Sequence, residues 1–405
     1  MTEKLYWADP HRTTFTSTVR AFTSRDGRPS VMLERSLFYP EGGGQLGDVG
    51  TLRAGGRTHA VVDTQIDDAG VIHHLLAEPP AEPLAGEVEG TIDATRRRDH
   101  MAQHTAQHAL SRALADLAKA DTVSARLGAT SCTIDVARPG IPDAELHRAE
   151  DLVNELIASD VAVRALYPTA EELPLLKLRK QPKVTEGTIR VIDIEGFDLT
   201  PCGGTHCTRT GQIGQARIVA LEKYKGMLRI TFHAGLRALT DARAKHAALA
   251  ALAADLTCGV ADVPAAVTRL RADLKNARAS LDAARGEIAT LLATSVLASL
   301  PEGPGPHVLP LERPGDDVNA LRKLANELTT DPRVLTLLAA PDAATGELSI
   351  VVQRGSGVAF DAGAFIKAQC AERGTRGGGR PERGEARFPT GTTLDALTTA
   401  ARALL

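Results

Sequence analysis

The sequence lacks an apolar run long enough to span a membrane, and residues 1–10 do not have the pattern of a secretory signal. Cysteine is scarce, and an odd number of scattered thiols argues against a disulfide framework and for a reducing compartment. A net charge of −3 neither requires nor excludes nucleic acid, because a basic face can lie on a nearly neutral protein. We therefore expect a soluble cytoplasmic protein. The five cysteines are Cys132, Cys202, Cys207, Cys258 and Cys370.

A chain of 405 residues is too long for one ordinary hydrophobic core, so several domains are expected. Changes in composition and turn residues divide it into residues 1–90, 91–235, 236–300 and 301–405. The segments differ in periodicity, so the fold class that we predict is α+β and multidomain.

A histidine-rich segment, RRRDHMAQHTAQHAL at residues 96–110, places His100, His104 and His108 four residues apart in a helix-favouring context. Residues four apart share one helix face, so two imidazoles at this spacing can close on one metal ion. The apolar residues fall on the opposite side, which predicts a helix that buries one stripe and points its imidazoles elsewhere. An isolated pair of this kind more often marks a solvated polar face. His100 stays open between a place beside the site and simple solvation.

A second candidate ligand pair lies in DLTPCGGTH, at residues 198–206. Cys202 and His206 repeat the four-residue spacing, and a thiolate with an imidazole is a typical zinc donor set. Gly203 and Gly204 between them allow a turn tight enough for both side chains to converge. Together the two pairs predict one zinc site per chain. Its four ligands are His104, His108, Cys202 and His206.

The first 90 residues contain short β-favouring runs separated by Asp- and Gly-type turns, at 16–22, 30–37, 59–66 and 71–76. This pattern predicts a small barrel or sandwich. Within it, residues 38–50 read FYPEGGGQLGDVG, whose glycines permit close approach of the backbone to a ligand. The alternative is an ordinary hairpin loop, because the segment lacks the Lys-Ser/Thr of phosphate-binding loops.

Residues 91–235 mix both periodicities, which predicts an α+β domain with an antiparallel sheet. After the histidine helix we expect a helix at 143–159 and another between residues 166 and 188. The strand-like segments lie at 131–136, 161–166, 188–193, 215–222 and 227–234.

Residues 236–300 read as two helices, at 238–256 and over a heptad seam that follows Pro264. The economical interpretation is an antiparallel helical hairpin, and the alternative is an intermolecular coiled coil. The seam consists of Val267, Leu270, Leu274, Ala277, Leu281, Ala284, Ile288 and Leu291.

Residues 301–405 predict a small α/β domain, with helices at 318–328, 363–370 and 394–404 and strands at 334–339 and 348–353. Between the last two helices, residues 373–387 read RGTRGGGRPERGEAR. Five arginines around a glycine turn suit a phosphate backbone, and a flexible solvated loop explains the same composition. The candidate contacts to nucleic acid are Arg376, Arg380 and Arg383.

These motifs together resemble the editing half of alanyl-tRNA synthetase: HTAQH, CGGTH, FYPEGGGQLGDVG, TGQIG at 210–214 and GGGRP at 377–381. More closely, the chain resembles the free-standing alanyl-tRNA editing proteins of the longer type, the AlaX family, over nearly its whole length. The resemblance implies an N-terminal β-barrel, the editing domain shared with threonyl-tRNA synthetase, a helical hairpin and a DHHA1-like C-terminal domain. The family's downstream AQGGG is replaced here by GGGRPERGEARF.

The resemblance further implies hydrolysis of the ester that joins serine or glycine to the terminal adenosine of tRNA(Ala), with Ala-tRNA(Ala) spared. A second site is needed because one small group changes binding by only about 1–3 kcal/mol. The four ligands carry over as zinc-site residues. The residues that the resemblance assigns to the amino-acid pocket are Gln45, Thr105, Thr122, Ser124, Gly203 and Gly204.

The role of zinc stays open at this point. Four protein ligands saturate a tetrahedral ion, and closed sites are usually structural. There are three hypotheses. Zinc anchors the helix to the Cys202 loop and positions the aminoacyl group, or His206 leaves the metal when substrate binds. In the third, the site holds no metal and the histidines act as acid and base groups. A zinc peptidase fits badly, because Thr105 and not glutamate follows His104. The non-enzymatic alternative is a tRNA-binding module with a structural zinc. A homodimer through the hairpin or the C-terminal domain is a further expectation.

Overall fold

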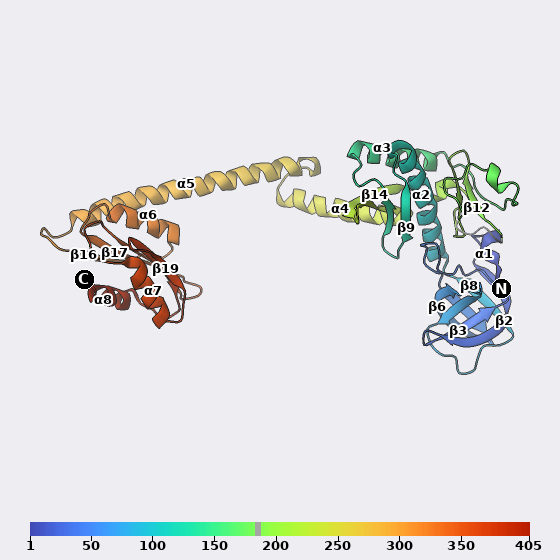
Figure 1. Cartoon of the computed structure of the whole chain (residues 1–405), viewed down its shortest axis with the longest axis horizontal. Helices are drawn as coiled ribbons and strands as arrows, with labels where there is room; N and C mark the ends of the chain where they lie inside the picture. The colour runs from blue at the N-terminus through green and yellow to red at the C-terminus, as the bar shows by residue number, and fades with distance from the viewer. Residues whose placement is uncertain (183–187) are drawn as a thin grey trace. The chain divides into compact units, whose positions relative to one another are not determined.

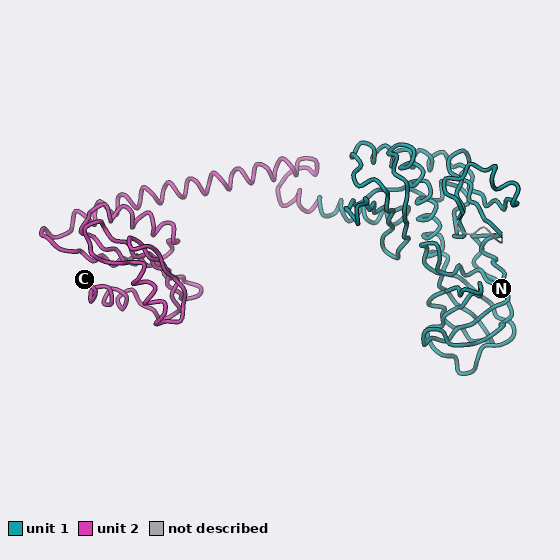
Figure 2. Tube along the Cα trace, viewed as in Figure 1, with its two compact units in different colours: residues 1–249 teal, residues 250–405 magenta. Residues whose placement is uncertain are grey.

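The computed structural model describes residues 1–182 and 188–405 of the chain. It divides into two compact units, Met1–Leu249 and Ala250–Leu405 (Figure 2). Among the described residues no single helix has both the length and the apolar character needed to cross a membrane. One bent pair, Gly235–Asp255 with Val260–Ala298, meets that test when the two helices are taken together, by length and composition only.

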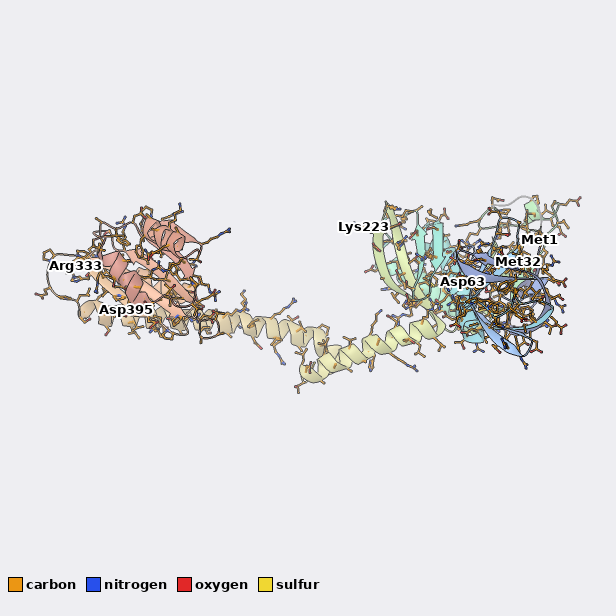
Figure 3. All side chains as sticks on the ribbon, turned by 90° about the horizontal axis from the view of Figure 1, so that it is seen from below. Met1, Met32, Asp63, Lys223, Arg333 and Asp395 are labelled. Atoms are coloured by element: carbon orange, nitrogen blue, oxygen red, sulfur yellow. The ribbon has the colours of Figure 1, made fainter. Side chains whose placement is uncertain are left out.

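The first 92 residues form a closed six-stranded β-barrel, which confirms the barrel and excludes the sandwich. Its strand order is β2-β3-β7-β6-β5-β8, and every neighbouring pair is antiparallel. Met32 of β3 and Asp63 of β6 mark two of its strands in Figure 3. Strands β5 and β8 were not expected. The strands are β2 (Thr14–Arg25), β3 (Arg28–Leu33), β5 (Gly50–Ala54), β6 (Arg57–Ile66), β7 (Ile72–Leu76) and β8 (Glu87–Ile92).

A short N-terminal segment lies beside the barrel. Strand β1 (Glu3–Lys4) pairs in parallel with β4 (Arg35–Ser36), and α1 (Leu5–Ala8) follows β1 directly. Tyr6 of α1 is buried against Tyr39, with the two rings edge to face. This segment therefore brings aromatic side chains next to the 38–50 loop.

The histidine-rich segment is helix α2 (Ala94–Ala118), which begins where the Asp93 carboxylate accepts the backbone N–H groups of Thr95 and Arg96. The expected single buried stripe is wrong, because α2 is buried on nearly every side. It lies among the sheet, α3, the barrel loop and the Cys202 loop, so several of its polar residues find their partners inside the protein. Gln103, for example, exchanges two hydrogen bonds of 2.9 Å with the backbone of Ala234.

Residues 119–234 add two antiparallel sheets, which confirms the α+β domain with an antiparallel sheet. The first sheet has the order β14-β15-β10-β9 and the second β11-β12-β13. The predicted helix at 143–159 is confirmed as α3 (Asp143–Ala158). The strands are β9 (Thr122–Leu127), β10 (Cys132–Val136), β11 (Val163–Leu166), β12 (Val191–Ile194), β13 (Asp198–Pro201), β14 (Ala216–Tyr224) and β15 (Met227–Ala234).

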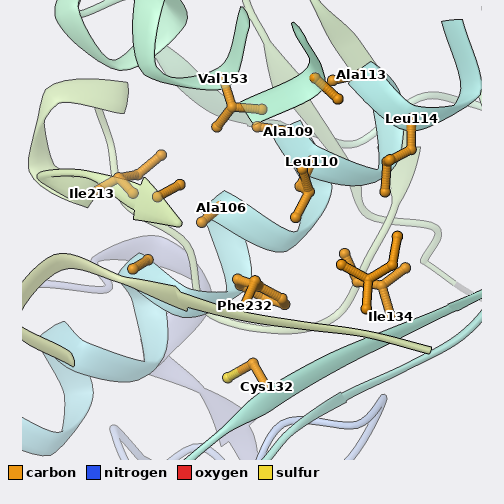
Figure 4. Packing of buried hydrophobic residues seen from close by; sticks show 14 of the residues in the cluster. Ala106, Ala109, Leu110, Ala113, Leu114, Cys132, Ile134, Val153, Ile213 and Phe232 are labelled. Carbon is orange, nitrogen blue, oxygen red and sulfur yellow. The ribbon is translucent and has the colours of Figure 1, made fainter. Parts of the chain in front are cut away.

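The core of this domain forms where α2 packs on the four-stranded sheet (Figure 4). Ala106, Leu110 and Leu114 of α2 are at most 1% exposed and face Ile134 and Phe232. Alanines on this face let the helix approach the sheet closely. Between residues 166 and 188 only the short η1 (Leu173–Leu175) is helical in the described part, and residues 183–187 lie outside it.

The second unit carries a five-stranded sheet of order β16-β17-β18-β20-β19, in which only β16 and β17 are parallel (Figure 1). The predicted helices α6, α7 and α8 are confirmed, and β16, β19 and β20 were not expected. The elements are α5 (Val263–Ala298), β16 (His307–Glu312), α6 (Val318–Leu328), β17 (Val334–Pro341), β18 (Leu348–Arg354), α7 (Ala362–Glu372), β19 (Gly377–Arg380), β20 (Arg383–Phe388) and α8 (Leu394–Arg402).

The arginine-rich segment and the predicted helical hairpin differ in how far the structure tests them. The arginine-rich segment is largely the hairpin of β19 and β20, so the idea of a flexible loop is wrong there. Two separate helices, α4 (Gly235–Asp255) and α5, occupy the predicted helical segment, and η3 (Val260–Asp262) lies between them. Their antiparallel packing as a hairpin stays a prediction.

The barrel contains a buried titratable group, His74 of β7. Its Nδ1 donates to the carbonyl of Val31 at 2.9 Å, and Ser36 Oγ donates to its Nε2 at 2.7 Å. Burial lowers its pKa to about 4, and this pattern of one donor and one acceptor uses the neutral imidazole.

We predict that the barrel loses stability as the pH falls from 7 to 5. In the unfolded chain His74 has an ordinary pKa near 6.5 and becomes protonated over this interval, whereas the folded state keeps it neutral. The free energy of unfolding therefore falls by about 2 kcal/mol between pH 7 and pH 5. Urea unfolding followed by tryptophan emission at both pH values measures it. His74→Gln keeps a donor and an acceptor but cannot titrate, so its loss should be smaller by that amount. Equal losses in the two proteins would contradict the prediction.

Candidate metal centre

Four side chains from α2 and the loop after β13 converge on one point, and they are the four predicted from spacing. The ligand atoms of His104, His108, Cys202 and His206 all lie within 4.8 Å of one another. Cys202 Sγ lies 3.4 Å from His104 Nε2 and 3.3 Å from His206 Nε2. A tetrahedral zinc with ordinary bond lengths separates sulfur and nitrogen ligands by about 3.5 Å. The donor set and its spacing therefore fit zinc.

The protonation states of Cys202 and His206 also suit a metal. Burial raises the pKa of Cys202, but the nearby His104 and His206 outweigh it and hold that pKa well below its ordinary value. Burial and the charge of His104 hold the pKa of His206 well below the usual range. A thiolate and a neutral imidazole are the forms that bind metal.

Each histidine ligand is oriented by a polar partner behind it. His104 Nδ1 lies 2.7 Å from the Oε1 atom of Gln45, which belongs to the 38–50 loop of the barrel. Gln45 also donates to Thr205 Oγ1 at 2.8 Å, and it is fully buried. Because its amide oxygen faces Nδ1, this nitrogen carries the proton and Nε2 is left for the metal. The glycine loop is thus part of the site and not an ordinary hairpin.

The partner of His108 is a carboxylate that the sequence reasoning missed. Asp198 Oδ2 lies 3.6 Å from His108 Nδ1, and Arg179 Nε donates to Asp198 Oδ1 at 2.8 Å. Burial raises the pKa of Asp198, but its bonds with His108 and Arg179 outweigh this and keep it ionised. Burial lowers the pKa of His108, yet Asp198 and Cys202 raise it overall. Asp198 opens the DLTPCGGTH motif, which was the available signal for it.

Thr105 lies behind His206 and not in a pocket. Its hydroxyl contacts His206 Nδ1 at 3.4 Å and accepts the backbone N–H of Cys207 at 3.0 Å. The side chain is fully buried and is not among the residues that line the cavity described below. Its observed role is to hold the ligand loop against α2.

The two glycines of the ligand loop have different surroundings. A Cβ on Gly204 would overlap the imidazole of His104 and lie 2.9 Å from Gln45 Oε1, so no side chain fits there. A Cβ on Gly203 would have Trp7 as its nearest neighbour, at 4.0 Å. Arg190 Nη1 donates to the carbonyls of Cys202 and Gly204, at 2.9 and 2.8 Å. Nothing in the sequence pattern had pointed to Arg190.

A cavity of about 760 Å³ opens beside the cluster. His104, His108 and Cys202 line it, and His206 does not. Thr122 and Ser124 of β9 lie on its wall, as does Gln107 of α2. Thr122 Oγ1 is 2.8 Å from Ser111 Oγ, and Ser124 Oγ donates to Asp135 at 2.7 Å. The lining also includes Gly203 and Gly204, so it unites most of the predicted pocket residues.

His100 is not one of the four clustered donors, and the three arginines belong to the second unit. His100 is only 1% exposed, which excludes the solvated reading. Burial lowers its pKa to about 4, and its Nδ1 has no hydrogen-bond partner among the described residues. Arg376, directly before β19, and Arg380, the last residue of β19, are exposed, while Arg383 Nε of β20 pairs with Glu385 at 3.2 Å.

Comparison with known proteins shows two family matches. Residues 12–96 match the model of tRNA synthetases class II (A), and residues 189–231 match the Threonyl and Alanyl tRNA synthetase second additional domain. The first match covers most of the barrel, and the second covers the loop of Cys202 and His206. Gln45, Cys202 and His206 therefore fall in regions similar to tRNA synthetases, whereas His104 and His108 lie between the two matched regions.

Curated relatives match nearly the whole chain. The alanine–tRNA ligase of Halorubrum lacusprofundi is 31% identical over 99% of this chain and 43% of its own length. That of Korarchaeum cryptofilum is 29% identical over 96% and 43%. The chain thus spans less than half the length of these relatives. A solved C-Ala domain of Aquifex aeolicus alanyl-tRNA synthetase aligns with 26% of the chain at 14% identity and a TM-score of 0.23, too low to support an argument.

The two glycines supply a matched test of the metal centre. Gly204→Ala should displace His104 or Gln45 and lower zinc affinity by about 10–100-fold, because a ligand and its supporting residue are disturbed together. Gly203→Ala should bind zinc like the unchanged protein, since a methyl group there has room. Zinc competition with a chromogenic chelator measures both. Equal affinities for the two variants would contradict this packing argument.

Proposed function

This chain is an AlaX-like relative of the alanyl-tRNA synthetases, and on that basis we propose that it is a trans-editing aminoacyl-tRNA hydrolase. It deacylates tRNA(Ala) that carries serine or glycine and spares Ala-tRNA(Ala). The observation that carries the proposal is the placement of His104, His108 and Cys202 on the wall of one cavity. That cavity holds a potential metal centre and room for an aminoacyl group in the same space.

The four-residue cluster supports a zinc-dependent reading. Zinc held by these residues would polarise the ester carbonyl, provided that a coordination position is open. His206 does not line the cavity, which argues against it as the ligand that gives way to substrate. The protein groups meanwhile fix the geometry, because Gln45 holds His104 and Asp198 holds His108. In the hydrolysis a water adds to the ester carbonyl and the acyl C–O bond breaks, which gives the free amino acid carboxylate, a proton that passes to solvent and the ribose hydroxyl of the tRNA.

The hydroxyls on β9 support discrimination by side chain. Thr122 and Ser124 both face the cavity, and each is held in place by a second polar group. The serine hydroxyl of a mischarged tRNA gains a polar partner there that the alanine methyl cannot use. Thr105, in contrast, acts through His206 and does not touch the substrate.

The second candidate is a tRNA-binding module with a structural zinc and no turnover. The specific observation in its favour is the closed set of four donors, because saturated sites are usually structural. It binds the same RNA but releases no amino acid, so a deacylation assay separates the two functions.

Features of the second unit support two partners. Arg376 and Arg380 are exposed and make no ion pair within the described part of the chain, which suits contact with the phosphates of tRNA(Ala). On α5, Leu270, Leu274 and Leu281 are 50–56% exposed although they belong to the heptad seam. An exposed seam of this kind supports a homodimer through the helical segment.

We expect the protein to release serine or glycine from charged tRNA(Ala) rapidly and alanine far more slowly. Cys202→Ala should reduce the rate by at least about 100-fold, because it removes a ligand from the cavity wall. Cys258→Ala, which changes a cysteine outside the site, is the matched control. Undiminished tRNA binding without release of any amino acid would instead establish the structural module.

Thr122→Val tests whether the Thr122 hydroxyl recognises the side chain of the seryl ester. The change keeps the shape and removes the hydroxyl, so kcat/KM for Ser-tRNA(Ala) should fall about 10-fold or more. The same variant should deacylate Gly-tRNA(Ala) at nearly the original rate, because glycine offers no side-chain hydroxyl. A parallel loss for both substrates would show that Thr122 supports the fold of the pocket and does not read the side chain.

A further inference from the structure

The cavity has a second wall, formed by Lys4, Trp7 and Arg190. Lys4 Nζ lies 4.3 Å from the centre of the Trp7 indole, and the Arg190 guanidinium lies 5.9 Å from the same ring. Trp7 Nε1 donates to the carbonyl of Gly203 at 2.9 Å, which fixes the indole against the ligand loop. Two cations and one aromatic ring thus share one surface.

Arg190 is a buried charge without a counter-ion in the described structure. The side chain is 6% exposed, and no described carboxylate lies within ion-pair distance of it. One nitrogen, Nη1, is used by the carbonyls of Cys202 and Gly204, while the buried Nε has no partner among the described residues. Buried charges in proteins are normally paired, because burial removes the water that stabilises an isolated charge. An anion bound in the cavity would supply the counter-ion that Arg190 lacks among the described residues.

Lys4 also has no acidic partner among the described residues. Burial lowers its pKa, and its observed partner is the indole ring and no described acid. The phenols nearby do not compensate it, since burial raises the pKa of both Tyr6 and Tyr39 and keeps them neutral. Arg190 and Lys4 thus place two positive charges on the cavity lining, and neither has an acidic partner among the described residues.

The size of the cavity leaves room for more than an amino acid. At about 760 Å³ it is within the range that holds whole small-molecule ligands of about 300–1,000 Å³. Aromatic rings stack on nucleobases, and cations beside them bind the phosphates. We propose that Lys4, Trp7 and Arg190 form a nucleotide subsite, in which the two cations bind a 5′-phosphate and the indole contacts the base.

The subsite deepens the proposed function and rests on it for the identity of its natural ligand. An aminoacyl ester at the metal centre is attached to the 3′-terminal nucleotide of the tRNA, so this nucleotide must lie within one ribose of the cluster. Trp7 donates to the carbonyl of Gly203, the residue after Cys202, so the subsite adjoins the ligand loop.

Trp7 is the only tryptophan of the sequence, so its emission reports on this wall directly. Titration of the full-length protein with AMP should change the emission with saturation. Adenosine and inorganic phosphate, each with half of the recognised groups, should bind at least tenfold more weakly. An absence of saturable change with AMP, or equal binding of adenosine, would overturn the proposal.

Lys4→Gln should raise the dissociation constant of AMP about tenfold, because a charged partner of the phosphate is lost. Lys223→Gln is the matched control, since Lys223 is exposed on β14 away from the cavity lining (Figure 3). The side-chain contact observed for Lys4 in the described structure is with Trp7 and not with a metal ligand, so this variant is expected to leave the cluster intact. Identical dissociation constants for both variants would remove Lys4, and with it the phosphate contact, from the subsite.

Competition identifies the source of the nucleotide. An uncharged tRNA(Ala) with its complete 3′ end should displace AMP, and the same tRNA without its terminal nucleotide should not. Displacement by both would contradict an RNA terminus as the occupant. Deacylation measured on the same preparation separates the two proposals: turnover without AMP binding rejects only the subsite, whereas AMP binding without turnover rejects only the editing activity.

Discussion

The buried ion pair of Arg97 and Asp48 joins the two halves of the first unit. Both side chains are 1% exposed, and Arg97 also donates to the carbonyls of Pro10 and Leu37. Asp48 in turn accepts the backbone N–H of Tyr39 at 2.7 Å. Loss of one member of such a pair strands a buried charge, which costs about 3–5 kcal/mol. The pair therefore fixes the 38–50 loop on α2.

The metal centre depends on that fixed loop. Gln45 reaches His104 only because the loop is held on α2 and its Gly44 fits against the backbone of Ala125, where a Cβ would come within 2.5 Å of the carbonyl oxygen. His108 is held by Asp198 of β13, and His206 contacts Thr105 of α2. The barrel loop, α2 and β13 thus each contribute one support, and none of them orients all the donors alone.

The sequence predicted the ligands better than their surroundings. The donors of α2 and the Cys202 loop follow from local four-residue spacings, which a helix and a tight turn convert directly into geometry. The burial of α2 does not, because it depends on segments far apart in the chain, among them Gln45 and Asp198. Arg190 could not be predicted for the same reason, because its side-chain hydrogen bonds in the described part of the chain go to the backbone carbonyls of Cys202 and Gly204. The β19–β20 hairpin was hidden by its glycines, which are poor strand formers on their own.

The division of the site between a barrel loop and a ligand loop has a consequence for its inheritance. The two regions that resemble tRNA synthetases, residues 12–96 and 189–231, lie far apart in the chain, yet Gln45 of the first contacts His104 and Thr205. A gene fragment that encoded residues 91–235 alone would carry every metal ligand but not the glutamine that sets the His104 tautomer. A segment that carries both the four donors and Gln45 must therefore include the barrel. We expect the barrel and the domain of residues 91–235 to be inherited together when genes recombine.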